Sequence, residues 1–549
     1  MAKSGARLLI ETLVNHGVDR FFCVPGESYL KVMDELVDDP VLRVVTCRHE
    51  GGAAFMAAAD ARASGKPAVL FASRGPGATN ASIAIHSAMQ GAVPLVACLG
   101  QVSTPKLGRG GLQEMDFGAV FGPMCKHVEQ VQDPGRIGEI VARAFQIATS
   151  GTPGPVVIGL PTDMLTATSD KPAGRPRATP RALASDADLA AVAERIAQAE
   201  RPVLIAGSLA DSAEARAALL AVSERWGLPV MTSYTHQDLF PNGHPHWGGE
   251  LGIRPPKGVV EAAKGADLVL AVGTRMLDMT SQGFTIPGAG QRLIHVFPDP
   301  DAIGVNFETE LGLVADAGDF LARLAARNAP PTPAARAGWI ARANEGYREG
   351  ARLRLRQSAD GIDFGWMIKA MIDHVPDDAV IACDAGNFTS WLTLQYPFKA
   401  TQTLIASEAG AMGMGIPAAV AAAIRYPGRQ VVGLAGDGGA LMTGNELATA
   451  VKERAKVRLI IANNAHYGTI RLHQEMHHPR RVHGANDLVN PDFAAWGRAF
   501  GAAGFTVSKP EEAGEVLRAA LAADGPAVID VKTSLENIVA VRTMDEVRG

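Results

Sequence analysis

One carboxylate stands among glycines in LAGDGGALMTG, the stretch from Leu434 to Gly444: the side chain of Asp437. The run before it, RQVVGLAG, is typical of a strand, GNELATAVKERA is typical of a helix, and VRLIIA is typical of a second strand leading to Asn463 and Asn464. A strand-helix-strand unit of about 30 residues has the size that a parallel crossover requires. Both strands then end at one edge of the sheet, where ligands bind in open α/β sheets. Asp437 and Asn464, 27 positions apart, are therefore predicted to converge.

This convergence would supply a carboxylate oxygen, an amide oxygen and a nearby backbone carbonyl. Such hard oxygen ligands suit Mg²⁺ or Ca²⁺ and not Zn²⁺. Mg²⁺ with so few protein ligands needs anionic groups, typically phosphates, to complete its octahedron. The amides of Gly438, Gly439 and Ala440 lie where a turn opens into a helix, a position suited to phosphate. Asp437 could instead only cap the helix, but the paired asparagines at the matching strand end favour a metal and a diphosphate.

A second carboxylate, Glu50, lies in the first predicted unit, in TCRHEGGAAFMAAADARASG. It follows a strand-like run, LRVVTC, and precedes an alanine-rich helical pattern. A glutamate in the first turn of a helix is favourable against the helix dipole. The residues alone leave open whether Glu50 has this structural role or a catalytic one.

The GDG motif is followed, after 24 residues, by the pair NN. This arrangement resembles the signature of thiamine diphosphate enzymes. The resemblance covers nearly the whole chain and is strongest to the acetolactate synthase-like branch. It implies that Mg²⁺ is bound by Asp437, by Asn464 and by the backbone carbonyl of His466. The ion would in turn hold the diphosphate of the cofactor.

The resemblance also decides the interpretation of Glu50, because RHEGGAA is similar to the family segment that carries the cofactor-activating glutamate. It implies that Glu50 shares a proton with N1′ of the aminopyrimidine ring, which leads to deprotonation of the thiazolium C2. In SEAGAMGMG, Met412 occupies the position of the family residue that wedges between the two cofactor rings, and the carbonyl of Gly410 would receive the N4′ amino group. CDAGNFTSW resembles a second diphosphate-binding loop, and FASRGPGATN resembles a turn beside the pyrimidine ring.

Together these segments define the cofactor-binding residues that the resemblance implies. They are Pro25, Gly26, Glu50, Gly75, Gly77, Asn80, Gly386, Asn387, Phe388, Gly410, Met412, Gly436, Asp437, Gly438, Gly439, Ala440, Asn464, His466, Tyr467 and Gly468.

Several substrate-side segments depart from the family pattern or are open to two interpretations. GGLQEMDF resembles a substrate-side segment, which makes Gln113 a predicted catalytic residue, although it could be a surface-loop glutamine. The arginine expected to grip the carboxylate of a second oxo acid is replaced by Met279, and a methionine cannot supply that charged, bidentate clamp. His473 stands where many members have a tryptophan. The stretch HQEMHHPRRVHG is predicted to be a solvated basic loop, the alternative being a flap that receives an anionic substrate.

FAD is retained by acetolactate synthases, and two features argue against it in this chain. RPVLIAGSLADSAEA lacks a GxGxxG, so no dinucleotide fingerprint is present. The segments MLDM and FPDP also differ from their family counterparts. FAD-binding members do not rely on that fingerprint, however, so FAD stays open as an additional cofactor. The predicted cofactors are thiamine diphosphate and Mg²⁺, with FAD as the less favoured addition.

The elements that must position these residues alternate along the chain. Apolar strand-like runs recur, each followed by a glycine-rich turn and a helical pattern, which indicates parallel strands buried on both faces and an α/β, doubly wound class. Two stretches rich in Pro and Ala, near Leu165 and Asn328, are predicted to be linkers. They divide the chain into a pyrimidine-binding unit at 1–165, a central unit at 188–327 and a diphosphate-binding unit at 360–540.

Composition restricts the partners. The formal net charge is −5 with no long basic run, which suggests neither nucleic acid nor an anionic membrane surface. No segment reads as a signal peptide or a membrane span, and the five cysteines show no CxxC spacing. We expect a cytoplasmic protein. The resemblance implies a homodimer or a tetramer in which Glu50 of one subunit and Asp437 of its neighbour serve one site.

The resemblance implies an enzyme that decarboxylates a 2-oxo acid and ligates the resulting enamine intermediate to a carbonyl acceptor, with acetolactate synthase as the most economical interpretation. The alternative is a simple 2-oxo acid decarboxylase or C–C lyase of the benzoylformate or oxalyl-CoA type. A nucleotide-dependent oxidoreductase is a different class, against which the missing GxGxxG counts. A non-catalytic subunit would be expected to lack Glu50 or the predicted metal ligands, and both are present.

Overall fold

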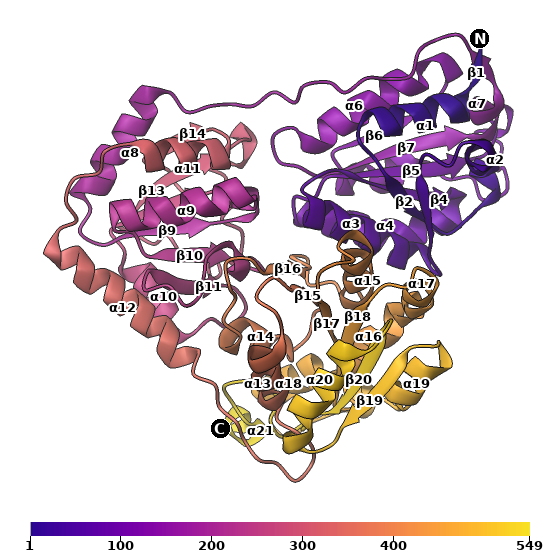
Figure 1. Ribbon diagram of the computed structural model, residues 1–549. Helices are drawn as coiled ribbons and strands as arrows, with labels where there is room; N and C mark the ends of the chain where they lie inside the picture. The colour runs from indigo at the N-terminus through magenta and orange to yellow at the C-terminus, as the bar shows by residue number, and fades with distance from the viewer. Residues whose placement is uncertain (1) are drawn as a thin grey trace.

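The computed structural model describes residues 2–549 as three α/β units, each built on a six-stranded sheet (Figure 1). All neighbouring strands within these three sheets run parallel. The prediction of three doubly wound parallel-sheet domains is confirmed. The sheets span residues 20–161, 202–314 and 380–532, and we keep 1–165, 188–327 and 360–540 as the proposed domain boundaries.

The first unit has the strand order β3-β2-β4-β5-β7-β6. A short antiparallel pair, β1 (Lys3–Ser4) with β8 (Thr168–Ser169), joins the start of the chain to the end of this unit. The strands are β2 (Arg20–Cys23), β3 (Arg43–Thr46), β4 (Ala68–Ser73), β5 (Leu95–Gln101), β6 (His127–Gln130) and β7 (Pro155–Pro161). The helices are α1 (Gly5–Asn15), α2 (Leu30–Asp38), α3 (Glu50–Ser64), α4 (Arg74–Gln90), α5 (Phe117–Phe121), α6 (Ile137–Thr149) and α7 (Thr162–Thr166).

The central unit has the strand order β11-β10-β9-β12-β13-β14. Its strands are β9 (Pro202–Ala206), β10 (Val230–Ser233), β11 (Trp247–Leu251), β12 (Leu268–Val272), β13 (Arg292–Phe297) and β14 (Leu311–Val314). Its helices are α8 (Asp186–Gln198), α9 (Ala213–Trp226), α10 (Lys257–Gly265) and α11 (Ala317–Ala326), followed by α12 (Ala334–Gly350).

The third unit has the strand order β16-β15-β17-β18-β20-β19. Its strands are β15 (Val380–Cys383), β16 (Thr403–Ala406), β17 (Val431–Gly436), β18 (Val457–Asn463), β19 (Ala503–Val507) and β20 (Ala527–Lys532). Its helices are α13 (Gly365–His374), α14 (Thr389–Gln395), α15 (Gly415–Arg425), α16 (Asp437–Thr443), α17 (Leu447–Lys452), α18 (Gly468–His477), α19 (Phe493–Ala499), α20 (Ala513–Ala522) and α21 (Met544–Arg548).

The first and third sheets share one topology. Numbered from the first strand of each sheet, both have the order 2-1-3-4-6-5, whereas the central sheet has the order 3-2-1-4-5-6. In both orders the chain reverses direction across the sheet after its first strands, and ligands bind at the carboxyl ends of strands beside such a switch point. The shared strand-turn-helix rhythm of the first and third units thus reflects one architecture used twice.

The segments between the units are only partly irregular. Residues 170–185 cross from the first unit to the second without helix or strand (Figure 1). The second predicted linker, NAPPTPAARAG, becomes α12 from Ala334 onward, directly after Pro333. Arg336 explains why this stretch is not a free linker: its buried guanidinium donates to the carbonyls of Ile196 (2.7 Å) and Trp226 (3.1 Å) and so holds α12 on the central unit.

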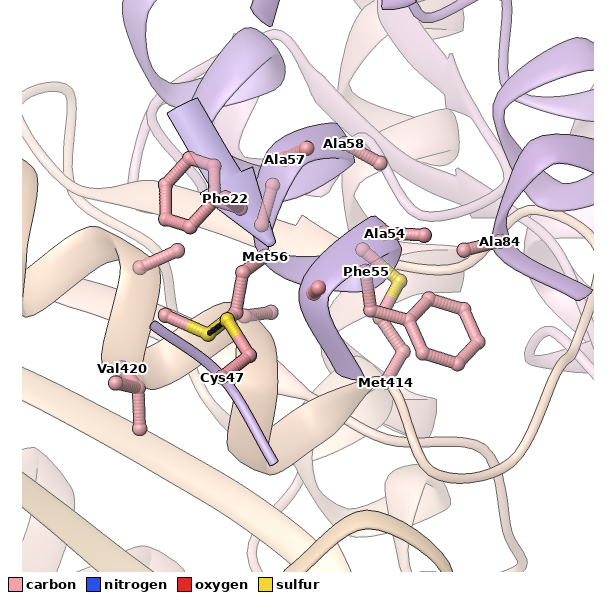
Figure 2. Packing of buried hydrophobic residues seen from close by; sticks show 14 of the residues in the cluster. Phe22, Cys47, Ala54, Phe55, Met56, Ala57, Ala58, Ala84, Met414 and Val420 are labelled. Atoms are coloured by element: carbon pink, nitrogen blue, oxygen red, sulfur yellow. Dashed lines mark hydrogen bonds between the residues drawn. The ribbon is translucent and has the colours of Figure 1, made fainter. Parts of the chain in front are cut away.

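The first and third units pack together through two alanine-rich helices, α3 and α15, which lie side by side (Figure 1). Small side chains let the two helices approach closely, and Met414 and Val420 from the third unit belong to one buried cluster with Phe55 and Met56 from the first (Figure 2). Arg425 at the end of α15 forms an ion pair of 2.6 Å with a buried carboxylate of α3, Asp60. Within residues 2–549, no helix combines the length and apolar character needed to cross a membrane.

Candidate functional site

Asp437 lies at the carboxyl end of β17, the strand flanked by β15 and β18, and is the first residue of α16. Its side chain is buried, and its oxygens accept hydrogen bonds from the amide of Gly438 (2.9 Å) and from the side-chain amide of Asn490 (2.9 Å). Burial raises the pKa of the Asp437 carboxyl, while hydrogen bonds from Gly438, Asn490 and the backbone at Ala465 and His466 act to lower the pKa. The carboxylate therefore faces the end of the next strand.

That next strand, β18, ends at Asn463, so Asn464 lies directly beyond it. Its side-chain oxygen accepts from the amide of His466 (3.0 Å), and Ala465 between them has a positive φ of 56°. The tight turn leaves the carbonyl of His466 without a hydrogen bond among residues 2–549. Asn464 also lines a cavity of about 410 Å³ at the ends of β18 and β20. The predicted convergence of the two strand ends is present in the fold.

Several other predicted residues surround these strand ends. A Cβ on Gly468 would lie 2.7 Å from the side-chain oxygen of Asn387 and 3.0 Å from the side-chain nitrogen of Asn464, so both side chains lie against the backbone of Gly468. A Cβ on Gly438 would lie 2.6 Å from the ring of Tyr467 and 3.5 Å from the terminal methyl of Met412. Glycine is required at such positions because any side chain would displace its neighbours.

The remaining predicted residues of this half lie in the same loops. The ring of Phe388 packs against the backbones of Gly386 and Gly436. Ala440 is buried in α16, and Gly410 takes a positive φ of 63° with open space where a side chain would be.

A buried carboxylate that the sequence interpretation missed, Asp384, holds this half together. It follows β15, accepts from the amides of Ala385 (2.7 Å) and Gly413 (2.8 Å), and would lie 2.6 Å from a Cβ on Gly439. Burial raises the pKa of Asp384 to about 6, and amide hydrogen bonds oppose the rise. An aspartate at the end of a predicted strand and before a glycine-containing turn was the available signal, the same one that identified Asp437.

Glu50 occupies the first turn of α3, where His49 caps the helix by accepting from the amide of Gly51 (3.0 Å). One carboxylate oxygen of Glu50 accepts from the side-chain amide of Asn80 (2.9 Å), and a Cβ on Gly77 would lie 3.0 Å from the other oxygen. Two residues of the GPGATN segment of α4, Gly77 and Asn80, therefore lie against the Glu50 carboxylate.

Gln113 lies beside the same turn through its backbone. It has a positive φ of 65°, and its carbonyl accepts from the amide of Gly75 (2.9 Å), while its side chain is exposed. Gly26 packs against Ser73 at the end of β4, where a Cβ would lie 2.4 Å from the Ser73 Cβ. Pro25 is exposed next to it. These positions lie around the carboxyl end of β4.

Within one chain the predicted residues form two groups, one in the first unit around Glu50 and one in the third unit around Asp437, and these two carboxylates share no hydrogen-bond donor among residues 2–549. The two units are linked instead by Glu446, which was not singled out from the sequence. One oxygen of this buried carboxylate accepts from the amides of Arg48 (2.9 Å) and His49 (3.0 Å), directly before Glu50.

The oxygen atoms at the two strand ends fit a magnesium ion. The carboxylate of Asp437, the amide oxygen of Asn464 and the free carbonyl of His466 are hard donors of the kind that Mg²⁺ takes. Gly438 and Gly439, which follow Asp437 in α16, carry no side chains, and an anionic group bound to the metal would find backbone amides there. The residues present therefore fit a metal-held diphosphate.

Comparison with known proteins assigns a family to each unit of the chain. Residues 3–120 match the N-terminal TPP binding domain of thiamine pyrophosphate enzymes. Residues 189–324 match the central domain of these enzymes, and residues 384–531 match their C-terminal TPP binding domain.

The relatives extend over nearly the whole chain. The acetolactate synthase large subunit of Parasynechococcus marenigrum (strain WH8102) is 34% identical over 546 residues, which cover 96% of this chain and 87% of that protein. The acetolactate synthase isozyme 1 large subunit of Escherichia coli (strain K12) is 31% identical over 541 residues, covering 98% and 95%. The solved thiamine diphosphate-dependent 4-hydroxybenzoylformate decarboxylase of Rhodococcus jostii RHA1 has the same fold, with a TM-score of 0.83, 24% identity and coverage of 97% and 99%. The chain therefore belongs to the thiamine pyrophosphate enzyme family and is an acetolactate synthase-like enzyme that uses thiamine diphosphate.

Proposed function

We propose that this enzyme decarboxylates a small 2-oxo acid and joins the remaining fragment to a second carbonyl compound, with Mg²⁺ holding the diphosphate of the cofactor. The observation that carries the proposal is the convergence of Asp437, Asn464 and the free carbonyl of His466 at two adjacent strand ends, in a chain whose relatives over 96% of its length are acetolactate synthase large subunits. Thiamine diphosphate, when bound, supplies the electron sink that decarboxylation of a 2-oxo acid requires.

Glu50 is the proposed acid–base residue. Its carboxylate is oriented by the side-chain amide of Asn80 (2.9 Å), and the absence of a side chain on Gly77 leaves room at its other oxygen. A carboxyl group fixed in this way can hold and return a proton at a ring nitrogen placed against it. Glu50→Gln keeps the shape and removes the proton transfer, so we expect cofactor binding to persist while turnover falls by orders of magnitude.

We propose that the site is assembled from two chains. In support, the two carboxylates bind different partners in different units within one chain: Glu50 accepts from Asn80 in the first unit, and Asp437 accepts from Gly438 and Asn490 in the third. Mixing tests this directly. Glu50→Gln and Asp437→Ala each disable both sites of a homodimer, but a mixed dimer has one site with neither change.

If subunits exchange freely, half of the dimers are mixed and each has one intact site out of two, so activity should return to about a quarter of the wild-type value. A site built within one chain would give no recovery. Wild-type mixtures with each single variant control for exchange and for inactivation during mixing.

The choice between carboligation and simple decarboxylation depends on the acceptor side. We propose carboligation, because the relatives that extend over 96% or more of this chain are acetolactate synthase large subunits. Purified protein with thiamine diphosphate, Mg²⁺ and pyruvate, followed by NMR, should give acetolactate. Acetaldehyde alone would identify a simple decarboxylase, and no turnover of pyruvate would direct the search to larger, aromatic or CoA-linked oxo acids.

We also propose that catalysis needs no flavin. The switch point of the central sheet lies between β9 and β12. Its two loops meet there directly: a Cβ on Gly207 would lie 2.5 Å from the Cβ of Thr274 and 2.6 Å from the carbonyl of Gly273. Carboligation by flavin-stripped protein, with a visible absorbance spectrum that lacks flavin bands, is the expected result. Activity that depends on added FAD would contradict the proposal.

A further inference from the structure

The loop after β11 carries an arginine, Arg254, in an uncommon backbone conformation. Arg254 has a positive φ of 56° and is followed by Pro255 and Pro256, which restrict the turn before α10 begins. Gln282, also with a positive φ, donates from its side chain to the carbonyls of Gly252 (2.9 Å) and Met279 (2.6 Å). The Arg254 loop is therefore tied to Met279, the uncharged position in the segment after β12.

The side chain of Arg254 reaches from the central unit to the third unit. One guanidinium nitrogen lies 3.5 Å from Nε2 of His473 and 3.6 Å from the sulfur of Met476, both on α18. This helix starts at Gly468, which is in close approach to Asn464. His473 lies five residues further on, roughly 8 Å along the helix axis. The guanidinium is thus near the predicted metal group and is open to solvent.

The positive charges at this place lack a counter-ion. Among residues 2–549, neither Arg254 nor Arg542 has a carboxylate within ion-pair distance. Burial and the charge of Arg542 lower the pKa of Arg254, and burial together with Arg254 and His477 lowers the pKa of His473. Arg254 and Arg542 therefore act on each other as uncompensated cations, and the neighbouring ring of His473 is shifted toward its neutral form.

Two other arginines in this region behave differently. Arg471 on α18 and Arg548 on α21 both pair with the buried carboxylate of Glu475, at 3.0 Å and 2.9 Å. The structure thus neutralises some cations of this region with a buried glutamate and leaves Arg254 beside His473 unpaired. The segment that contains His473, expected to be a solvated loop, continues α18 as far as His477, so His473 has a fixed position. A fixed, unpaired guanidinium beside a polar ring suits a carboxylate ligand.

We propose that Arg254, with His473 beside it, binds the carboxylate of the acceptor 2-oxo acid. This inference rests on the proposed carboligase function. In that reaction one 2-oxo acid loses CO₂, its remaining acyl carbon forms a bond to the carbonyl carbon of the second, and the second keeps its carboxylate. The donor is the poorer candidate, because a cation bound to the carboxylate that must leave as CO₂ would stabilise the ground state and slow the reaction.

The test compares acceptors with and without a carboxylate. Arg254→Ala should raise the apparent KM for pyruvate as acceptor roughly tenfold to a hundredfold, the size expected when hydrogen bonds to a charged group are lost. With acetaldehyde as acceptor, which has no carboxylate, the variant should match the wild type. Arg254→Lys should recover part of the effect, and Arg352→Ala, a change at an exposed arginine on another surface, should have none. Equal losses with both acceptors would overturn the proposal.

A binding measurement separates failure of this inference from failure of the proposed function. Isobutyrate, which resembles pyruvate but cannot react, is titrated into wild-type and Arg254→Ala protein and followed by saturation-transfer NMR. Weaker binding to the variant supports the anion site even if the wild type forms no acetolactate. Equal binding to both proteins, or no binding to the wild type, overturns it.

Discussion

Replacing Glu446 with alanine would remove a buried carboxylate at the start of the helix that carries Glu50. In the wild type, one oxygen of Glu446 accepts from the amides of Arg48 (2.9 Å) and His49 (3.0 Å), and the other accepts from the hydroxyl of Thr449 (2.6 Å). The two amides precede α3 and have no partner within that helix. Alanine would leave both without their acceptor.

The expected cost follows from these contacts. A buried donor that loses its partner costs about 1–3 kcal/mol, so two amides give about 2–6 kcal/mol. Because Arg48 is solvent-exposed, water can reach one of them, and we expect the lower part of that range, about 2–3 kcal/mol. The Glu446 carboxylate fills the space beside α3, because a Cβ on Gly52 would lie only 2.5 Å from it, so alanine at position 446 would leave that space empty.

Amide hydrogen exchange measures this loss locally, without requiring the whole chain to unfold in one step. A cost of about 2 kcal/mol corresponds to roughly thirtyfold faster exchange of the amides that begin α3. Glu446→Gln is the matched control. Its side-chain oxygen can accept from the two amides, and the hydroxyl of Thr449 can accept from its amide group, so exchange should stay near the wild-type rate. Exchange in the alanine variant as slow as in the wild type would refute the capping role.

Two further predictions concern stability. Burial raises the pKa of Glu250 from its ordinary value of 4.5 to about 8. The contribution of Glu250 to folding stability is therefore complete below pH 4.5 and is lost as the pH rises through 8. Glu250→Gln should flatten the fall of the melting temperature between pH 4.5 and 8, and parallel curves of melting temperature against pH for the two proteins would contradict the raised pKa. Gly415→Ala would place a Cβ 2.7 Å from the Leu434 carbonyl oxygen, whereas Gly428→Ala meets nothing within 4 Å. Gly415→Ala should lower the melting temperature, because overpacking reduces the free energy of unfolding by about 1–3 kcal/mol, and Gly428→Ala should leave the melting temperature unchanged. Equal melting temperatures for the two variants would show that the backbone around Gly415 moves to make room for the methyl group.

The sequence was sufficient for the parts of the site that depend on local order. Asp437 and Asn464 follow apolar strands in one crossover unit, and parallel strands connected by a helix must end at the same edge of the sheet. The same reasoning applied to strand β15 would have found Asp384. Buried strands alternating with helices predicted the fold class for the same reason: hydrophobic periodicity is a property of neighbouring residues.

Other contacts could not be predicted, because they join residues that are remote along the chain and carry no shared pattern. Asn490 binds Asp437 across 53 positions, Glu446 binds the amides before Glu50 across about 400, and Arg254 meets His473 across 219. The stretch around Asn328 illustrates the same limit: its proline and alanine content predicted a linker, but packing of Arg336 against the central unit made part of it a helix.

The sequence by itself therefore determined which chemical groups stand at the ends of which strands, since strand order within a crossover and burial pattern are local. Only the tertiary structure decided which groups are paired and which are left free. Glu475 and Arg254 show this: the buried carboxylate neutralises Arg471 and Arg548, while Arg254 is held beside His473 without an anion. The physical reason is that ion pairing depends on distances of a few ångströms between side chains from separate units, and the packing of whole domains sets those distances.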